Sequence, residues 1–170
     1  MPELPEVETV RKGLEKLLNN FHIERIEVLK ERSIASIGGS KSFINNVQNC
    51  YLGQWKRRGK YLIGSLSTKD KISKGYLIIH LRMTGQFKLL EKQTLPCKHT
   101  RVRFFEKRGQ ELRFIDIRNF GQMWYVPSTK SVPEIVSGIK RLGPEPFSSD
   151  FNSRYLKEYL KNKTRSIKSA

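Results

Sequence analysis

The chain has 170 residues, 37% of them hydrophobic, so it is long and apolar enough to fold as one domain and is not intrinsically disordered. Its 33 Lys and Arg residues outnumber its 16 Asp and Glu residues, and the formal net charge is +17. No apolar run is long enough to span a membrane, and the acidic start Met-Pro-Glu-Leu-Pro-Glu does not have the apolar stretch of a signal peptide. We therefore expect a cytoplasmic protein with no membrane association.

The first element that we expect is a helix over Pro5–Asn20, because apolar residues recur at helical spacing through this segment. Pro5 suits the first helical position, and Glu6 and Glu8 lie in the first turn, where the helix dipole favours negative charge.

Segments rich in Ile, Val, Tyr and Phe follow this helix and predict about six β-strands. The predicted strands are Phe21–Lys30, Tyr51–Trp55, Lys60–Leu66, Tyr76–Leu90, Arg101–Glu106 and Glu111–Val126, with a short helix over Lys41–Asn49. Their short spacing argues against βαβ units. The predicted fold is therefore mainly β with flanking helices (α+β), as an antiparallel β-sandwich or flattened barrel with an N-terminal helix.

The character of the sequence changes after Val126. We expect a short helix over Ser131–Leu142, a rigid turn at Gly143–Pro146, and a second helix that Asp150 caps and that ends at Lys161. Thr164–Ala170 is typical of the first turn of another helix, and no stop signal follows it. We predict a β-sandwich domain over 1–130 and, over 131–170, a helical linker and the start of a further domain, so we expect this chain to be a fragment.

The excess of positive charge favours a polyanionic partner, because each phosphate that a Lys or Arg neutralises releases counterions. DNA, ribosomal RNA and an anionic membrane surface satisfy the charge equally well. Cys50 and Cys97 stand far apart, with no Cys or His at metal-binding spacing, so we expect two free thiols and no zinc site in this chain.

The first residues carry a pattern that a helix start does not fully explain, because Pro2 and Glu3 precede the helix. Removal of Met1 would give Pro2 a free secondary amine, which can attack a carbon that bears a leaving group and then form an iminium ion. A helix N-terminus nearby would lower the pKa of that amine, and Glu3 could transfer the protons of the reaction. If Met1 stays in place, Pro2 is an ordinary peptide nitrogen and cannot attack.

The segment Pro2–Thr9 resembles the opening signature of the formamidopyrimidine-DNA glycosylases. Four further motifs agree with this family in the same order: Arg57–Leu62, His80–Gly85, Lys98-His99 and Asp116–Gly121. One short motif would be weak, but five in order across some 120 residues are specific, and the resemblance extends over the whole chain.

The resemblance implies a catalytic β-sandwich joined to a second domain with a helix–two-turn–helix and a zinc finger. It implies base-excision repair, in which a glycosylase and AP lyase removes oxidised purines such as 8-oxoguanine and formamidopyrimidine from double-stranded DNA and nicks the strand by β,δ-elimination. We expect a monomer associated with the nucleoid, no cofactor or metal in this chain, and one zinc ion in the part beyond Ala170. With half of the DNA clamp missing, we expect these residues alone to be inactive or weak.

The matching positions also imply residue roles. Pro2 would be the nucleophile at the deoxyribose C1′, Glu3 the acid that protonates the sugar ring oxygen, and Glu6 a supporting carboxylate. Lys60, on a turn at the edge of a strand, would contact the phosphate and the damaged base.

A second group of residues would bind DNA by resemblance: Met83, Arg118 and Phe120 would push into the duplex as the nucleotide flips out, and His80 would contact a phosphate. His99, in the Lys98-His99 motif, belongs to the same group. Composition alone favours a core role for Met83 and Phe120 and a structural role for His80. Asn119 departs from the family pattern, since many members have a basic residue there.

Three alternatives remain open. The sister family excises oxidised pyrimidines, but its opening usually has Gly where Leu4 stands, and the run Leu4–Glu8 favours the purine branch. A basic nucleic-acid-binding module without chemistry would explain the charge. An N-terminal-proline enzyme acting on a small carbonyl compound, such as a tautomerase, would need neither the charge nor an Arg118/Phe120 loop.

Overall fold

The computed structural model of the chain describes residues 2–166. These residues form two compact units, of which the first ends at Lys140 and the second begins at Arg141. Among residues 2–166, no helix is long and apolar enough to cross a membrane.

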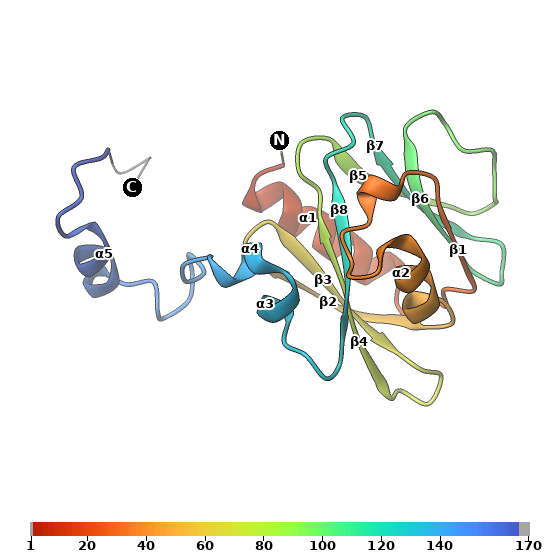
Figure 1. Cartoon of the computed structure of the whole chain (residues 1–170), viewed down its shortest axis with the longest axis horizontal. Coiled ribbons are helices and arrows are strands. Elements are labelled where there is room, and N and C mark those ends of the chain that lie inside the picture. The colour runs from red at the N-terminus through yellow and green to blue at the C-terminus, as the bar shows by residue number, and fades with distance from the viewer. Residues whose placement is uncertain (1, 167–170) are drawn as a thin grey trace. The chain divides into compact units, whose positions relative to one another are not determined.

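The first unit is a β-sandwich of two four-stranded sheets (Figure 1). One sheet has the order β1 (Arg25–Val28), β6 (Thr100–Phe105), β7 (Glu111–Asp116), β5 (Gly85–Leu90), and the other has the order β2 (Tyr51–Arg58), β3 (Tyr61–Ser67), β4 (Ser73–His80), β8 (Gln122–Pro127). Every pair of neighbouring strands is antiparallel. The predicted fold class is confirmed, and the two separate sheets make it a sandwich and not a barrel.

Two predicted strands are wrong in the same way, because each is a pair of strands that belong to different sheets. The predicted strand Tyr76–Leu90 breaks between β4 and β5, and Glu111–Val126 breaks between β7 and β8. A residue with left-handed backbone lies in each break: Arg82 has φ of 57° and Asn119 has φ of 58°. Such a residue cannot continue an extended strand, so the chain crosses from one sheet to the other at both places.

The register of the sheets brings these two crossovers together. His80, the last residue of β4, pairs with Gln122, the first residue of β8. Gly85, the first residue of β5, pairs with Asp116, the last residue of β7. The crossovers 81–84 and 117–121 therefore run side by side at one end of the sandwich.

The N-terminal helix α1 (Leu4–Leu17) is close to its prediction. Glu3 is the N-cap, and Pro5 occupies the second helical position, not the first. The side chain of Glu6 accepts a hydrogen bond from the backbone N–H of Glu3 over 3.0 Å, which satisfies a donor that the helix leaves free. The start of the chain is thereby tied to the first turn of the helix.

Two short elements stand between the first strands. The 3₁₀ turn η1 (Glu31–Ser33) was not predicted, and α2 (Gly39–Val47) begins two residues before the predicted helix. Only β1 forms within the predicted strand Phe21–Lys30, apart from an isolated bridge between His22 and Tyr51.

The hydrophobic core lies between the sheets and beneath the helices. Phe104 and Phe114 of one sheet and Trp55 of the other are buried in it. Helix α1 packs on the edge strand β2 and contributes Val7 and Leu14, and α2 packs on the edge strand β8 and contributes the side chains Phe43 and Val47. Each large apolar side chain buried in this way contributes about 1.5–3 kcal/mol, which fixes both helices against the sandwich.

Short helices follow β8. The structure has α3 (Val132–Ile135) and α4 (Ser137–Lys140) where one helix over Ser131–Leu142 was predicted. In the second unit, α5 (Ser153–Leu160) is capped by Asn152, whose side chain accepts from the Tyr155 N–H, and not by Asp150. Residues 164–166 are not helical, and the rest of the helix predicted over Thr164–Ala170 lies outside the described residues.

Candidate active site

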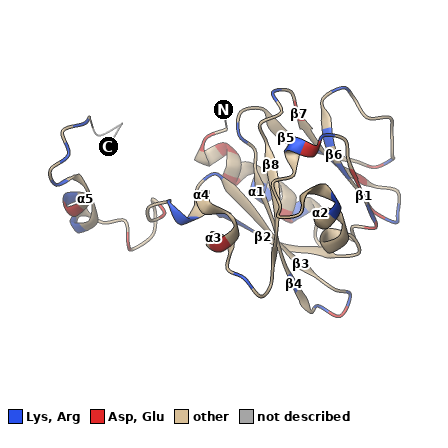
Figure 2. Cartoon of the chain, in the orientation of Figure 1, with Lys and Arg blue, Asp and Glu red and all other residues tan. Residues whose placement is uncertain are grey.

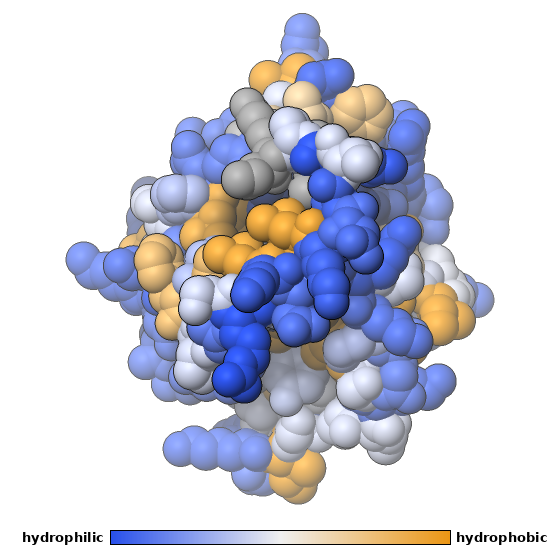
Figure 3. Space-filling view, turned by 90° about the vertical axis from the view of Figure 1, so that its left-hand side faces the viewer, coloured by the Kyte–Doolittle hydropathy of each residue, from blue (hydrophilic) through white to orange (hydrophobic). Residues whose placement is uncertain are grey.

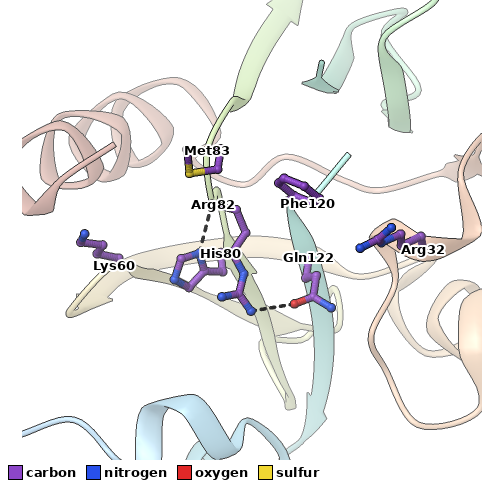
Figure 4. A pocket seen from close by; sticks show the side chains of 7 residues that line it. All are labelled: Arg32, Lys60, His80, Arg82, Met83, Phe120 and Gln122. Atoms are coloured by element: carbon purple, nitrogen blue, oxygen red, sulfur yellow. Dashed lines mark hydrogen bonds between the residues drawn. The ribbon is translucent and has the colours of Figure 1, made fainter. Parts of the chain in front are cut away.

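A cavity of about 550 Å³ opens where the two crossovers meet the turn between β2 and β3. Its walls are formed by Arg32, Lys60, His80, Arg82, Met83, Phe120 and Gln122 (Figure 4). Met83 and Phe120 come from the two crossovers, and Lys60 and Arg32 lie toward opposite ends of the cavity (Figure 4). The strand register therefore brings together residues that lie up to 90 positions apart in the chain.

Lys60 connects this cavity to the start of the chain. It follows Gly59, whose φ of 55° turns the chain between β2 and β3. Its ammonium group lies 2.8 Å from Oε2 of Glu3. The hydrogen bond from Lys60, followed by its positive charge, lowers the pKa of the Glu3 carboxyl, so Glu3 is ionised in this arrangement. Pro2, half-buried, is next to this ion pair.

His80 is a neutral hydrogen-bond donor. Its Nδ1 accepts the backbone N–H of Arg82 over 3.0 Å, so the proton of the neutral ring lies on Nε2. Burial, and then the positive charges of Arg82 and Lys60, lower the pKa of His80 to about 4. The edge of the ring also meets Tyr61, with centroids 4.5 Å apart. The imidazole can therefore donate to an anion without carrying a charge at neutral pH.

Met83 and Phe120 are not core residues, so the composition-based interpretation of both is wrong. Met83 is half-buried on the cavity wall, and Phe120 is 39% exposed. The guanidinium groups of Arg118 and Arg32 lie 5.2 Å and 5.6 Å from the centre of the Phe120 ring. An exposed aromatic ring beside two cations is suited to contact a stacked, negatively charged polymer.

Comparison with known proteins assigns the fold to a family. Residues 1–123 match the model of the formamidopyrimidine-DNA glycosylase N-terminal domain. The chain belongs to the formamidopyrimidine-DNA glycosylase family.

The curated relatives agree with this assignment. The chain is 85% identical over 170 residues to a formamidopyrimidine-DNA glycosylase of Prochlorococcus marinus strain NATL1A and 51% identical over 170 residues to that of Parasynechococcus marenigrum strain WH8102. Each match covers the whole chain but only 60% of the relative. The chain thus spans about 60% of the length of the glycosylases that it matches.

Solved structures of the same family share the fold. The chain superposes on Lactococcus lactis Fpg in a complex with DNA that contains an abasic site, with 31% identity and a TM-score of 0.86. It superposes equally well on the wild-type Lactococcus lactis Fpg in a complex with DNA that contains an oxidised pyrimidine, with 32% identity. Both matches cover 99% of this chain and 59% of the other.

Five predicted site residues of this glycosylase-family domain are not part of the cavity wall: Pro2, Glu3, Glu6, His99 and Arg118. Glu3 reaches the wall through Lys60, and Arg118 through its contact with the Phe120 ring. Glu6 is exposed, and its role in the helix cap accounts for its position. His99 is half-buried, and its carbonyl accepts the backbone N–H of Asp116 over 2.9 Å. Its main chain therefore supports the end of β7.

Sequence reasoning missed three residues of the cavity wall. Arg82 and Gln122 are joined by a hydrogen bond of 2.8 Å that crosses the floor of the cavity (Figure 4). Arg82 lies in the motif His80–Gly85, and its charge between two predicted site residues is the signal that could have identified it. Arg32 lies on the 3₁₀ turn η1, outside every motif, and only the fold places it beside Phe120.

The two cysteines are free thiols, as predicted, with Cys50 buried and Cys97 exposed. Within residues 2–166, no three His, Cys, Asp or Glu side chains gather as a metal site.

Proposed function

We propose that this chain is the catalytic domain of a base-excision-repair DNA glycosylase and AP lyase that removes oxidised purines from double-stranded DNA. One observation carries this proposal: the ion pair between Glu3 and Lys60 joins the Pro2-Glu3 terminus to a cavity with Met83 and Phe120 on its wall. In this proposal Pro2 is the nucleophile, Glu3 the proton-transfer group, and Met83 with Phe120 the apolar wedge, as base extrusion and excision require.

Charge supports DNA as the partner. The chain carries +17, and Lys and Arg are distributed over both units (Figure 2). Hydrophilic side chains also make up most of the face drawn in Figure 3. A base-sized occupant fits the cavity, whose 550 Å³ lies in the usual range for ligand sites.

The proposed reaction begins with the Pro2 amine after removal of Met1. Its lone pair attacks C1′ of the deoxyribose, and the bond between C1′ and the damaged base breaks, so the base leaves with that electron pair and takes a proton from water. Glu3 then transfers the proton from the Pro2 nitrogen to the ring oxygen as the sugar opens, which leaves an iminium ion. Loss of a C2′ proton expels the 3′ phosphate, and a second elimination expels the 5′ phosphate.

The position of Lys60 determines when Glu3 accepts a proton and when it donates one during the proposed reaction. While the ion pair holds, Glu3 is a carboxylate and can accept the proton of the Pro2 amine. When Lys60 turns toward the phosphate or the damaged base, Glu3 loses the partner that lowers its pKa and can then donate. Glu6 supports this pair through its bond to the Glu3 N–H.

We propose that Met83, Arg118 and Phe120 enter the duplex as the damaged nucleotide leaves it. The exposed Phe120 ring and its two cationic neighbours support this role. His80 would donate its Nε2–H to a backbone phosphate. His99 would support the DNA-binding surface from β7 through its main chain.

The remaining expectations are also part of the proposal. The segment 131–170 would link the sandwich to a second domain, and residues of the full-length protein beyond Ala170 would bind the zinc ion that the resemblance implies. The protein would act as a monomer in the cytoplasm, near the nucleoid.

Borohydride trapping tests the proposal. The protein is a chimera in which this chain replaces the matched 60% of the NATL1A relative, with Met1 removed. Mixed with 8-oxoguanine DNA and borohydride, it should form a stable cross-link that peptide mapping places on Pro2, since borohydride reduces an iminium ion. A matched chimera that retains an N-terminal tag should give no proline adduct.

The alternatives predict other results. Salt-dependent DNA binding with no cross-link, unaffected by removal of Met1, would favour a non-catalytic module and overturn the proposal. Faster trapping on oxidised pyrimidines than on 8-oxoguanine would indicate the activity of the sister family. We include this substrate because the Lactococcus lactis relative has been solved in a complex with DNA that contains an oxidised pyrimidine.

A further inference from the structure

The two crossovers that carry Met83, Arg118 and Phe120 are irregular segments, yet they share an unusual backbone feature. Arg82 immediately precedes Met83, Asn119 immediately precedes Phe120, and both have left-handed backbone with φ of 57° and 58°. Residues other than glycine adopt this conformation at an energetic cost, and it persists only where surrounding contacts impose it. The crossovers therefore need a fixed point.

Asp116 provides that point, because its carboxylate is fully buried beneath both crossovers. Its Oδ2 accepts the backbone N–H of Gly121 over 2.7 Å. Its Oδ1 accepts the hydroxyl of Thr84, which is the residue after Met83. That hydroxyl oxygen in turn accepts the backbone N–H of Arg118 over 2.9 Å. One carboxylate and one hydroxyl thus hold both ends of the segment 118–121 and tie it to the other crossover.

The surroundings of Asp116 are equally restricted. A Cβ on Gly121 would lie 2.5 Å from the Phe114 ring, so only glycine lets this N–H approach the carboxylate. The main chain of Asp116 donates to the His99 carbonyl and accepts from Nε of Arg101 over 2.7 Å, which fixes β7 against β6. The carboxylate itself is therefore held in place by the sheet.

We propose that Asp116 and Thr84 are positioning residues that hold Met83, Arg118 and Phe120 in one arrangement before DNA arrives. This inference rests on the proposed function. The Asp116 side chain is fully buried, so breaking either of its hydrogen bonds would leave a polar atom without a partner away from water, and the linkage is rigid. The ordering of the two crossovers is complete in the free protein, and base extrusion does not have to supply it.

Thr84→Val tests the linkage with the least disturbance, because it keeps the shape of the side chain and removes only the hydroxyl. In the chimera it should slow excision of 8-oxoguanine from fully paired DNA roughly tenfold, because both hydrogen bonds of the hydroxyl, to Asp116 and from Arg118, are lost. The rate should stay near that of the parent protein when the lesion lies opposite an abasic site, where extrusion is easy. Thr84→Ser should restore the rate.

Thr68→Val is the matched control. The Thr68 hydroxyl oxygen also accepts a backbone N–H, from Ile72 over 3.2 Å, but in the β3–β4 turn at the other end of the sheet. This variant makes the same chemical change away from the cavity and should keep its excision rate. Equal losses for Thr84→Val on both DNA substrates, or no loss on either, would overturn the proposal.

A readout without DNA separates this proposal from the proposed function. In amide hydrogen exchange of the 170-residue chain, the N–H groups of Arg118 and Gly121 should exchange slowly. Thr84→Val should speed exchange at Arg118 more than at Gly121, whose bond to Asp116 remains. Rapid exchange at both amides in the parent chain would refute the linkage even in an active chimera. A chimera that fails to excise while these amides stay protected would refute the proposed function alone.

Discussion

The backbone N–H of Arg82 donates to Nδ1 of His80 over 3.0 Å, although the two residues are only two positions apart. This hydrogen bond closes a short turn over Leu81. It also decides the chemistry of His80, because the remaining nitrogen is then a donor that faces a cavity rich in cations.

We expect His80 to make stability depend on pH in a defined window. Its pKa in the folded protein is about 4, below the 6.5 of an ordinary His, so the unfolded chain takes up the proton first as the pH falls. The free energy of unfolding should therefore decrease between pH 6.5 and pH 4, and His80→Gln should remove part of that decrease, on the order of 1 kcal/mol. Urea unfolding at both pH values measures it. His22→Gln, on the far bridge to Tyr51, is the control, and an equal change in both variants would contradict the assignment.

Acid should weaken the sheet that contains β7 through Glu111. Burial would raise the pKa of Glu111, but hydrogen bonds from Arg103 and Arg113 outweigh it and lower the pKa to about 2. A lowered pKa stabilises the fold above the ordinary value of 4.5, and this contribution disappears as the pH falls toward 2. Glu111→Gln should destabilise the chain by about 3 kcal/mol at pH 7, because it removes the anion that Arg113 pairs with and leaves Arg103 with Glu27, and by much less at pH 2.

Thermal unfolding at the two pH values checks this prediction. Glu91→Gln is a suitable control, because Glu91 is exposed and its carboxylate accepts a hydrogen bond from the uncharged side chain of Gln110. A destabilisation by Glu111→Gln that does not change with pH would show that packing, and not charge, is responsible.

Lys60→Ala should separate the two stages of the proposed reaction. Excision of an intact 8-oxoguanine should fall by more than tenfold, because the base contact is lost and the ion pair no longer holds the Glu3 carboxylate beside the cavity. Nicking at an existing abasic site, which needs no base contact, should fall less. Single-turnover rates of the chimera on the two substrates measure the difference, and equal losses would indicate a phosphate contact only.

Arg32 should bind the DNA backbone beside Phe120. Arg32→Ala should weaken binding to any duplex and reduce the slope of log K against log salt by roughly 1, the amount expected for one phosphate. Lys69→Ala, in the turn between β3 and β4, removes the same charge at the other end of the sheet. Fluorescence anisotropy at several salt concentrations compares the two variants. Identical slopes would show that Arg32 does not contact the DNA.

The sequence predicts most elements of the fold because their patterns are local. Helix α1 shows its apolar spacing and its first-turn carboxylates within 14 residues, and the ends of most strands lie within a few residues of their predictions. The two crossovers could not be predicted in this way. Apolar residues continue on both sides of Arg82 and Asn119, so the pattern predicts one continuous strand. Neither residue is a glycine, which would have indicated left-handed backbone.

The candidate site was also predicted in part, where its residues lie in local motifs and not where they depend on tertiary contacts. Motifs identified Lys60, His80, Met83, Arg118 and Phe120, but the ion pair between Glu3 and Lys60 joins residues 57 positions apart and follows only from the packing of α1 on β2. Asp116 and Thr84 stand inside recognised motifs, yet their roles depend on the register of β5 against β7. Tertiary contacts of this kind leave no local trace in one sequence.

The hairpin of β3 and β4 also offers a position at which a label can be attached far from the cavity. Tyr61 pairs with His80 at the cavity, whereas Ser67 pairs with Ser73 at the opposite end of the same two strands. A fluorophore or an inserted peptide at the exposed Lys69-Asp70 pair would thus be separated from the cavity by the whole length of the hairpin. A tag fused to the N-terminus would instead block the proposed Pro2 nucleophile. The turn between β3 and β4 is therefore suited to immobilisation and to single-molecule work.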